Sequence, residues 1–282
     1  MDDRKRSLLS VHAAILFFGV TGLFSKLVEL PAIDIIAYRS VFAVLTLLIV
    51  LGVTRGAIRI HNLKHIALMA GLGILLSIHW VSYFYSMQVS GVAVGMIALF
   101  TYPVMTVFIE PLFHGDKPKP KDIFCGLIML VGVALIVPDF STSNSVTVGI
   151  FWGIFSAVFF SLRNVLQKHY LSQYGGVTSM LYQCFFAGIV ALPFISLPTS
   201  NVTTHQWLLL LVLASIFTAL PHSLFTSSLR HLKAKSVGLI ASLQPLYGAV
   251  FAFLILSEQP SISTLFGGLI ILGAAAYESY SA

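Results

Sequence analysis

Residues 94–118 read VGMIALFTYPVMTVFIEPLFHGDKP, an apolar run of membrane-spanning length that Pro103 interrupts. Residues 237–260 read VGLIASLQPLYGAVFAFLILSEQP and repeat the pattern around Pro245. In each stretch the interrupting proline precedes an acidic residue by 13 positions, and a further proline follows two positions later. An internal repeat defines the structural unit of a chain. The unit here is predicted to be half of the sequence.

Other segments support a division into two related domains, residues 1–140 and 141–282. The halves align when the sequence is shifted by about 142 residues, with slips of one or two positions at loops. Each match is weak alone, but the matches occur in the same order. They pair Gly19–Lys26 with Ser161–Lys168, Tyr38–Arg39 with Tyr182–Gln183, and Gly126–Gly132 with Gly267–Gly273.

The composition is that of an integral membrane protein. Hydrophobic residues make up 57% of the chain and charged residues 9%, whereas a soluble domain has about 25% charged residues. A helix needs about 20 apolar residues to cross about 30 Å of hydrocarbon. We therefore expect an all-α protein with ten transmembrane helices, spans 1 to 10, near residues 8–28, 34–53, 65–88, 92–113, 121–138, 147–169, 177–197, 206–228, 236–256 and 261–281.

The basic residues predict the orientation of these spans. The net charge is +6, but its distribution indicates membrane topology rather than a nucleic-acid partner. Basic loops face the cytoplasm, so both termini are expected to be cytoplasmic and the protein to lie in the inner membrane. Thirteen of the 16 Lys and Arg residues fall on one side of the ten-span arrangement: Arg4, Lys5, Arg6, Arg55, Arg59, Lys64, Lys117, Lys119, Lys121, Lys168, Arg230, Lys233 and Lys235.

Five spans in each half is an odd number, so the second half enters the membrane inverted relative to the first. An inverted repeat allows a transporter to open to either side around a midplane site. The alternative is that duplication merely enlarged the bundle. Cys125 and Cys184 lie within expected spans and are interpreted as small packing residues. Span 1 is too long for a cleavable signal peptide.

Several features resemble the EamA-like branch of the drug/metabolite transporter superfamily across essentially the whole chain. They are the two five-span halves, the lysine ending span 1, the Tyr102–Pro103 break, and Ser257-Glu258-Gln259-Pro260 followed by two glycines six residues apart. The resemblance implies a secondary transporter that exports small organic metabolites, amino-acid-like solutes or drugs. It also implies that spans 1, 3, 4, 6, 8 and 9 surround a cavity while 2, 5, 7 and 10 lie outside. The first repeat departs from the family pattern, because Asp116 stands where glutamate is usual.

Two histidines near mid-membrane are candidates for the cavity. Span 3 contains His79, Trp80 and Tyr83, and span 8 contains Pro221 and His222. Histidine changes charge near neutral pH, so a proton-coupled site is one interpretation. The other is a neutral histidine that bonds a carbonyl freed by proline. A metal site is not expected, since no third ligand has suitable spacing.

The proline breaks of spans 4 and 9 supply further candidates. Proline leaves a helix carbonyl without its donor, which membrane-depth backbone tolerates inside protein or beside a water-filled cavity. We expect Tyr102, Gln244 and Tyr247 to line a cavity beside Pro103 and Pro245. A kink used only for packing is the alternative.

Charged residues at the span ends predict gates or ion pairs. Lys26 and Arg39 enclose Glu29 and Asp34 near the outer mouth, as either an ion-pair cluster or a substrate gate. Ionisable groups at such depth are costly and default to functional hypotheses. Near the inner side, Lys168 is a further candidate for a gate or an ion pair. Arg163 reaches either the cavity or the inner interface, and Glu110 faces headgroups or pairs with a basic neighbour.

The remaining expectations concern chemistry and partners. No Gly-x-x-x-x-Gly-Lys-[Ser/Thr] motif occurs, so ATP is not expected to drive transport. No cofactor is expected, and the protein is not expected to be an enzyme. The expected partners are a small-molecule solute and membrane lipids, with a homodimer left open. The alternative functions are a lipid flippase, a channel and, less favoured, an intramembrane enzyme, for which neither paired acids nor a zinc motif is present.

Overall fold

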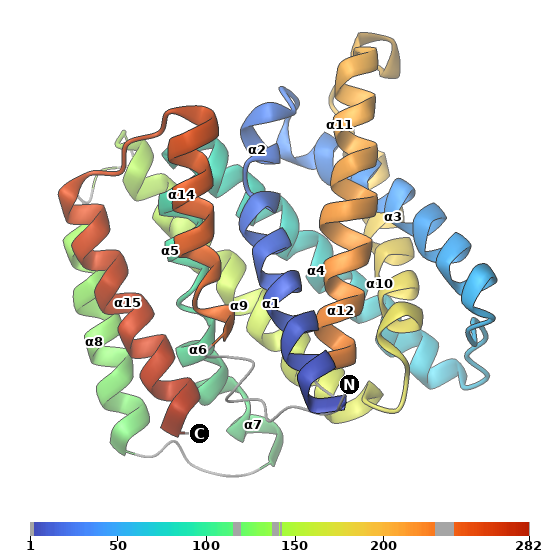
Figure 1. Ribbon diagram of the computed structural model, residues 1–282, viewed down its shortest axis with the longest axis horizontal. Helices are drawn as coiled ribbons and strands as arrows, with labels where there is room; N and C mark the ends of the chain where they lie inside the picture. Colours follow the sequence, from blue (N-terminus) through green and yellow to red (C-terminus); the bar gives the residue numbers. More distant parts are fainter. Residues whose placement is uncertain (1–2, 115–119, 137–140, 142, 229–239, 282) are drawn as a thin grey trace.

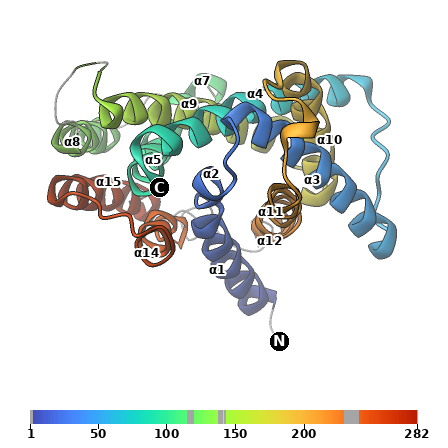
Figure 2. The same cartoon turned by 90° about the horizontal axis from the view of Figure 1, so that it is seen from above.

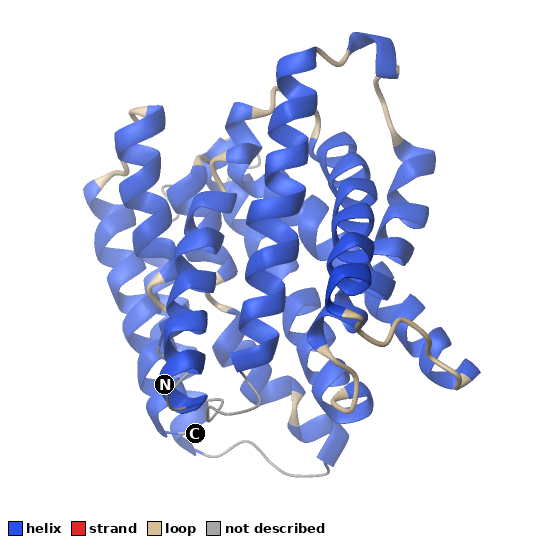
Figure 3. Cartoon of the chain, turned by 45° about the vertical axis from the view of Figure 1, so that its right-hand side comes forward, coloured by secondary structure: helices blue, strands red, loops and turns tan. Residues whose placement is uncertain are grey.

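The computed structural model describes residues 3–114, 120–136, 141, 143–228 and 240–281, and the regular structure in these ranges is entirely helical (Figure 3). Asp116, Lys117, Lys119, Arg230, Lys233 and Lys235, which the sequence analysis named, lie outside them. In the first half the helices are α1 (Asp3–Thr21), α2 (Phe24–Leu27), α3 (Ala32–Thr54), α4 (Leu63–Ser90), α5 (Val92–Leu99), α6 (Tyr102–Ile109), α7 (Pro111–His114) and α8 (Pro120–Ile136).

The second half begins with two long helices and continues with shorter segments. They are α9 (Ser145–Leu171), α10 (Gly176–Ala191), the 3₁₀ turns η1 (Leu192–Phe194) and η2 (Thr199–Asn201), α11 (Thr204–Ala214), the π-helix η3 (Ser215–Ala219), α12 (Leu220–Ser228), α14 (Gln244–Leu256) and α15 (Ile262–Ser281).

Length and hydropathy identify a multi-pass membrane protein. Seven segments of the described chain are long and apolar enough to cross a bilayer, and three shorter apolar helices accompany them: 123–136, 244–256 and 262–277. Leu45, Ile49 and Val53 on α3 and Leu127, Leu130 and Val131 on α8 are exposed, as lipid-facing side chains would be. An all-helical multi-pass membrane fold is therefore confirmed. Ten crossings remain a prediction.

Each proline-interrupted stretch contains a break just before its proline. In the first repeat α5 ends at Leu99, and Pro103 is the second residue of α6. In the second repeat a turn at residues 242–243 precedes α14, whose second residue is Pro245. Proline suits the first turn of a helix because no intrahelical bond requires its N–H there. A similar interruption separates α1, which ends at Thr21, from α2, which begins at Phe24, although span 1 was expected to be continuous.

The helices form a bundle with its two outer pairs at opposite sides (Figures 1 and 2). α8 packs on α15 at one side, and α3 packs on α10 at the other, with α1, α4, α9 and α12 between them. The two ends of the chain lie at the same end of the bundle (Figure 1). The contacts recur in equivalent pairs: α4 packs on α9 as α12 packs on α1, and α6 packs on α9 as α14 packs on α1.

A close backbone crossing joins α8 to α15. A Cβ built on Gly132 would lie 2.9 Å from the carbonyl oxygen of Gly267, and a Cβ built on Gly267 would lie 2.6 Å from that of Gly132. Real Cβ atoms do not approach so closely, so only glycine permits this crossing. Small residues serve such close approaches in membrane bundles. The equivalent Gly273 has nothing within 4 Å of its built Cβ and takes no part.

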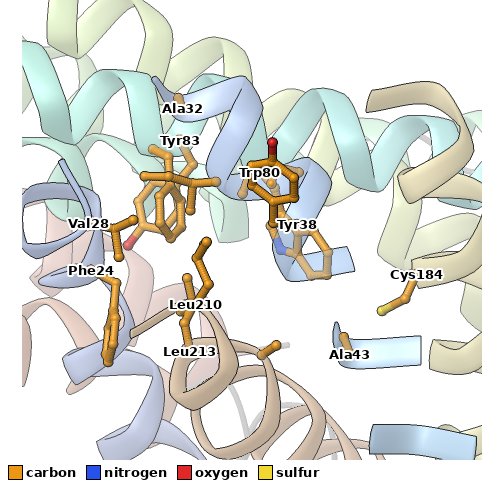
Figure 4. Close-up of a cluster of buried hydrophobic side chains, with 14 of the residues drawn as sticks. Phe24, Val28, Ala32, Tyr38, Ala43, Trp80, Tyr83, Cys184, Leu210 and Leu213 are labelled. Atoms are coloured by element: carbon orange, nitrogen blue, oxygen red, sulfur yellow. The ribbon is translucent and has the colours of Figure 1, made fainter. Parts of the chain in front are cut away.

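A buried apolar cluster joins the first half to α11 of the second half. Figure 4 shows Phe24 and Val28, Tyr38 of α3, and Trp80 and Tyr83 of α4 beside Leu210 and Leu213 of α11. The two cysteines, Cys125 and Cys184, are buried and form no disulfide, in agreement with their interpretation as packing residues. The cluster supports one wall of the cavity described next.

Candidate functional site

A cavity lies where the two halves meet. Its volume is about 70 Å³ on a measure that counts the space for the centres of water molecules. One water needs about 10–15 Å³ on that measure, so this conformation has room for several waters. The lining residues are Ile15, Phe18, Thr21, Arg39, His79, Trp80, Tyr83, Phe84, Leu99, Phe100, Tyr102, Phe160, Arg163, Asn164, His222, Phe225, Ala241 and Gln244.

The cavity lining repeats between the halves. Seven lining residues belong to the second half, and six of them have a lining counterpart 142 positions earlier. This offset agrees with the one that aligns the two halves by sequence. The pairs are Phe18 with Phe160, Thr21 with Arg163, Trp80 with His222, Tyr83 with Phe225, Leu99 with Ala241, and Tyr102 with Gln244.

Arg39 projects from α3 into the cavity wall, and its side chain is 1% exposed. Its guanidinium carbon lies 4.1 Å from the centre of the Trp80 ring and 5.3 Å from that of Phe84. Nε donates a hydrogen bond to Thr218 Oγ1 at 2.7 Å, but the buried Nη1 has no partner in the part of the chain that the structure describes. A buried charge without full hydrogen bonding is costly. Since span 2 was expected outside the cavity, Arg39 is an exception to that expectation.

Arg163 reaches the same cavity from α9, rather than the inner interface. Its Nε donates to Gln183 Oε1 at 2.8 Å, and Nη1 donates to Asn164 Oδ1 at 2.8 Å. Both guanidinium groups lie close enough to Cys184 and His222 to interact with them electrostatically. Neutral amides orient Arg163, and no acidic side chain neutralises it among the described residues.

His79 is buried between the two halves. Its Nδ1 lies 2.7 Å from Ser156 Oγ, and the Ser156 hydroxyl donates its hydrogen to the His79 carbonyl at 2.9 Å. Because that hydroxyl has one hydrogen, the geometry assigns donation to Nδ1 of the histidine. Nε2 of the neutral ring is then an acceptor. The ring also stacks on Phe160, with centroids 4.6 Å apart.

His222 follows the π-helix of span 8. Its Nδ1 lies 2.9 Å from the Thr218 carbonyl, which can only accept, so the proton again sits on Nδ1. Pro221 lacks the N–H that would bond the Phe217 carbonyl. The Thr21 hydroxyl of span 1 lies 3.0 Å from that carbonyl and 2.9 Å from the Phe17 carbonyl of its own helix, so its one hydrogen is shared between the two acceptors. The histidine itself bonds the next carbonyl along the helix.

The proline breaks place Tyr102 and Gln244 in the lining, while the Tyr83 hydroxyl is buried and forms no hydrogen bond with the residues that the structure describes. Gln244 approaches that hydroxyl without reaching hydrogen-bond geometry. Tyr247 does not line the cavity, so its assignment is corrected. It packs in the cluster around Val11 and Ile15, because it lies one turn further along α14, on the face that crosses α1.

The charged residues at the span ends do not form the predicted cluster. Lys26 Nζ donates to the Gln88 carbonyl at 2.7 Å. Asp34 accepts hydrogen bonds from the Ser196 N–H and hydroxyl and from the Leu197 N–H, and so fixes the loop after η1. The ion-pair interpretation is wrong for this mouth. Lys26 and Asp34 form hydrogen bonds mainly with backbone groups, not with oppositely charged side chains.

Near the opposite end Lys168 pairs with Glu110 at 2.8 Å. The side chains are 67% and 38% exposed, so this is a solvated ion pair at the end of the bundle. The acid of the second repeat, Glu258, accepts from the Val92 N–H at 2.8 Å and caps α5. No group of three or more metal-ligating residues occurs among the described residues.

Several residues of the lining were not predicted from the sequence. Phe18, Thr21, Phe160 and Asn164 are ordinary in type and carry no motif. The repeat itself contained the missing signal. Shifting the predicted Arg163 by 142 positions leads to Thr21, and the same shift from Tyr83 leads to Phe225.

A known protein family and individual proteins match this sequence over nearly its whole length. The sequence model described as the EamA-like transporter family matches residues 5–137 and again residues 147–278. "Uncharacterized transporter YxxF" of Bacillus subtilis (strain 168) is 24% identical, with 97% of this chain and 89% of that protein covered. "Pseudopaline exporter CntI" of Pseudomonas aeruginosa (strain UCBPP-PA14) is 26% identical, with 95% and 93% covered.

A solved structure has the same fold. A chain of known crystal structure superposes with a TM-score of 0.69 over 96% of this chain and 94% of its own length. The two sequences are 15% identical. At this identity the similarity concerns the fold alone, which the two chains share over nearly their whole lengths.

Proposed function

Because the chain belongs to the EamA-like transporter family, we propose that it is a secondary transporter that exports small organic metabolites, such as amino-acid-like solutes, by alternating access. The relative named as a pseudopaline exporter supports the direction. The two five-helix halves, residues 1–140 and 141–282, form the moving units, and the cavity between them holds the solute.

The paired cavity lining is the observation that carries this proposal. Six of the seven lining residues of the second half are repeat counterparts of lining residues of the first half. If an inverted repeat relates the halves, its axis passes through the cavity, and exchanging the conformations of the halves moves the opening from one side to the other. The equivalent helix pairs, α4 with α9 and α12 with α1, support the same axis.

The proposal includes an orientation in the inner membrane. Both termini face the cytoplasm, together with the basic loop that contains Arg55 and Arg59. The two chain ends lie at the same end of the bundle, which supports this arrangement. Membrane-impermeant maleimide would test it on single cysteines placed at the amino terminus and at position 59. Labelling of the two from different compartments would contradict the proposal.

Transport is tested first in cells and then in liposomes. Untargeted metabolite profiling of the medium, with and without the protein, identifies candidate solutes. Purified protein in liposomes should then take up the best candidate, and unlabelled solute on the opposite side should accelerate this uptake. A carrier shows such exchange, whereas a channel does not. Solute flux without exchange acceleration would contradict alternating access.

A matched pair of variants locates the pathway. Phe160→Trp adds a larger ring to a cavity of about 70 Å³, and we expect at least about tenfold slower transport, because overpacking a confined site is unfavourable. Phe151→Trp makes the same change on α9 at a position that is 61% exposed. This control should transport normally. Equal rates for both variants would place the solute elsewhere.

A further inference from the structure

The cavity has an excess of positive charge. Arg39 and Arg163 both line it, and none of the lining residues is an aspartate or glutamate. The acidic groups Asp34, Glu110 and Glu258 are engaged elsewhere, at a loop, at Lys168 and at the start of α5. Two guanidinium groups therefore share a buried space without a counter-charge from the described residues.

Arg39 is the more informative of the two. Its Nε is held by Thr218, and its face is fixed over Trp80 at 4.1 Å, so the orientation of the guanidinium group is set before any ligand arrives. Its Nη1 is buried and has no hydrogen-bond partner within residues 3–114, 120–136, 141, 143–228 and 240–281. A buried polar atom without a hydrogen bond is uncommon and requires an explanation. A ligand that accepts a hydrogen bond at this nitrogen supplies one.

The other lining residues indicate which chemical group the rest of that ligand carries. Phe18, Phe100 and Phe160 join Trp80 and Tyr102 around the cavity, and eight of the 18 lining residues are Phe, Tyr or Trp. Such surfaces favour a planar apolar group. Arginine pairs with a carboxylate through two parallel hydrogen bonds, and this geometry adds specificity as well as energy.

We propose that the transported solute is an organic carboxylate with a planar apolar body, whose carboxylate binds Arg39 while Arg163 supplies the second positive charge. The proposal rests on the proposed function, because it assigns the substrate class of the same cavity. The arginines occupy different repeat positions: the counterpart of Arg39 is Gln183, and the counterpart of Arg163 is Thr21. The anion site is therefore asymmetric within a symmetric cavity.

A series of probes with one body and different head groups tests this assignment. Phenylacetate, phenylacetamide, 2-phenylethylammonium and phenyl phosphate are titrated into purified full-length protein in nanodiscs. Binding is followed through Trp80 fluorescence in a Trp152→Phe, Trp207→Phe background, which leaves one of the three tryptophans. Phenylacetate should bind about 10- to 100-fold more tightly than phenylacetamide, as expected for the loss of a charged hydrogen-bond partner. The ammonium probe should not bind.

Variants assign the preference to residues. Arg39→Gln should reduce phenylacetate affinity about 10- to 100-fold and leave phenylacetamide affinity nearly unchanged. Arg39→Lys keeps the positive charge but lacks the planar guanidinium group that pairs with both carboxylate oxygens. It should therefore restore part of the difference in affinity between phenylacetate and phenylacetamide. Arg163→Gln, like Arg39→Gln, should weaken the binding of phenylacetate. Arg59→Gln, on an exposed loop, should bind all probes as the wild type does.

Four results would overturn the proposal. They are equal affinity for phenylacetate and phenylacetamide, tighter binding of the ammonium or phosphate probe, a carboxylate preference that survives in both Arg39→Gln and Arg163→Gln, and no saturable binding of phenylacetate. The binding assay does not depend on transport, so failure of this inference can be distinguished from failure of the proposed function. Carboxylate binding without flux in liposomes would refute the proposed function alone, whereas flux of a neutral or cationic solute that carboxylates do not inhibit would refute this inference alone.

Discussion

Thr218→Val should destabilise the protein through Arg39. The Thr218 side chain is fully buried, and its hydroxyl accepts from Arg39 Nε at 2.7 Å while donating to the Leu213 carbonyl at 2.7 Å. Valine has nearly the same shape, so the change removes both bonds with little repacking. Since Nη1 already lacks a partner, the variant leaves a second guanidinium nitrogen unsatisfied.

Two typical hydrogen-bond energies bracket the loss of unfolding free energy expected for Thr218→Val. A hydrogen bond to a charged group contributes about 1.5–3 kcal/mol, whereas side-chain hydrogen bonds in a membrane bundle average about 0.6 kcal/mol with a maximum near 1.7. The bond to Arg39 is charged, short and fully buried, so we expect a loss of about 1.5–2 kcal/mol. At about 2–4 °C per kcal/mol, the midpoint of thermal unfolding should fall by about 3–8 °C.

A double-mutant cycle isolates the interaction. Thermal unfolding in detergent is measured for wild type, Thr218→Val, Arg39→Met and the double variant, and the coupling energy should reach about 1–1.5 kcal/mol. Thr54→Val is the matched control, because its exposed hydroxyl bonds only the Val50 carbonyl of its own helix, at 2.7 Å. That variant should change stability by less than about 0.5 kcal/mol. A Thr218→Val cost that is the same with and without Arg39 would refute the reasoning.

Four further substitutions test other parts of the fold by the same unfolding measurement, with hydrogen exchange added for one of them. Gly132→Ala should cost about 1–3 kcal/mol because its Cβ meets the Gly267 carbonyl, whereas Gly273→Ala, with open space, should gain up to about 1 kcal/mol of helix propensity; the reverse order would contradict the crossing. Lys168→Gln should change stability by no more than about 0.5 kcal/mol, since the ion pair is solvated, and a larger loss would mean that the pair acts in a network. Asp34→Asn should cost about 1–3 kcal/mol and increase hydrogen exchange in the loop after η1; unchanged exchange would contradict its role.

The fold was predictable because its signals are local and repeated. Apolar runs of membrane length and the prolines at 103 and 245 are readable from one stretch at a time. The interruption between α1 and α2 was not readable, since no proline marks it. It occurs at Gly22, whose built Cβ would meet Met87 and Met96, so the close approach depends on residues of α4 and α5.

The site was predictable where depth alone decides the contact. His79, His222 and Gln244 were expected near mid-membrane on spans that surround a cavity, and all three line the cavity of the structure. Arg39 could not be assigned in the same way. It was expected near the outer mouth beside Asp34, but its contacts are Trp80 on α4 and a hydroxyl 179 positions away. Which face of an apolar helix turns inward depends on its neighbours, and a nearly uniform apolar pattern does not encode it.

The proposed transport function places two requirements on the cavity, and different lining pairs of the repeat meet them. Alternating access requires walls that remain closely packed in both conformations, and the pair Phe18 and Phe160 keeps the same aromatic residue in each half. Recognition requires a ligand to be held in one orientation, and the pairs Thr21 with Arg163 and Tyr102 with Gln244 differ in charge or polarity. A symmetric site would bind an asymmetric solute equally well in two orientations. Divergence at these positions removes that degeneracy, so the residues that distinguish the halves are the ones in which to seek specificity.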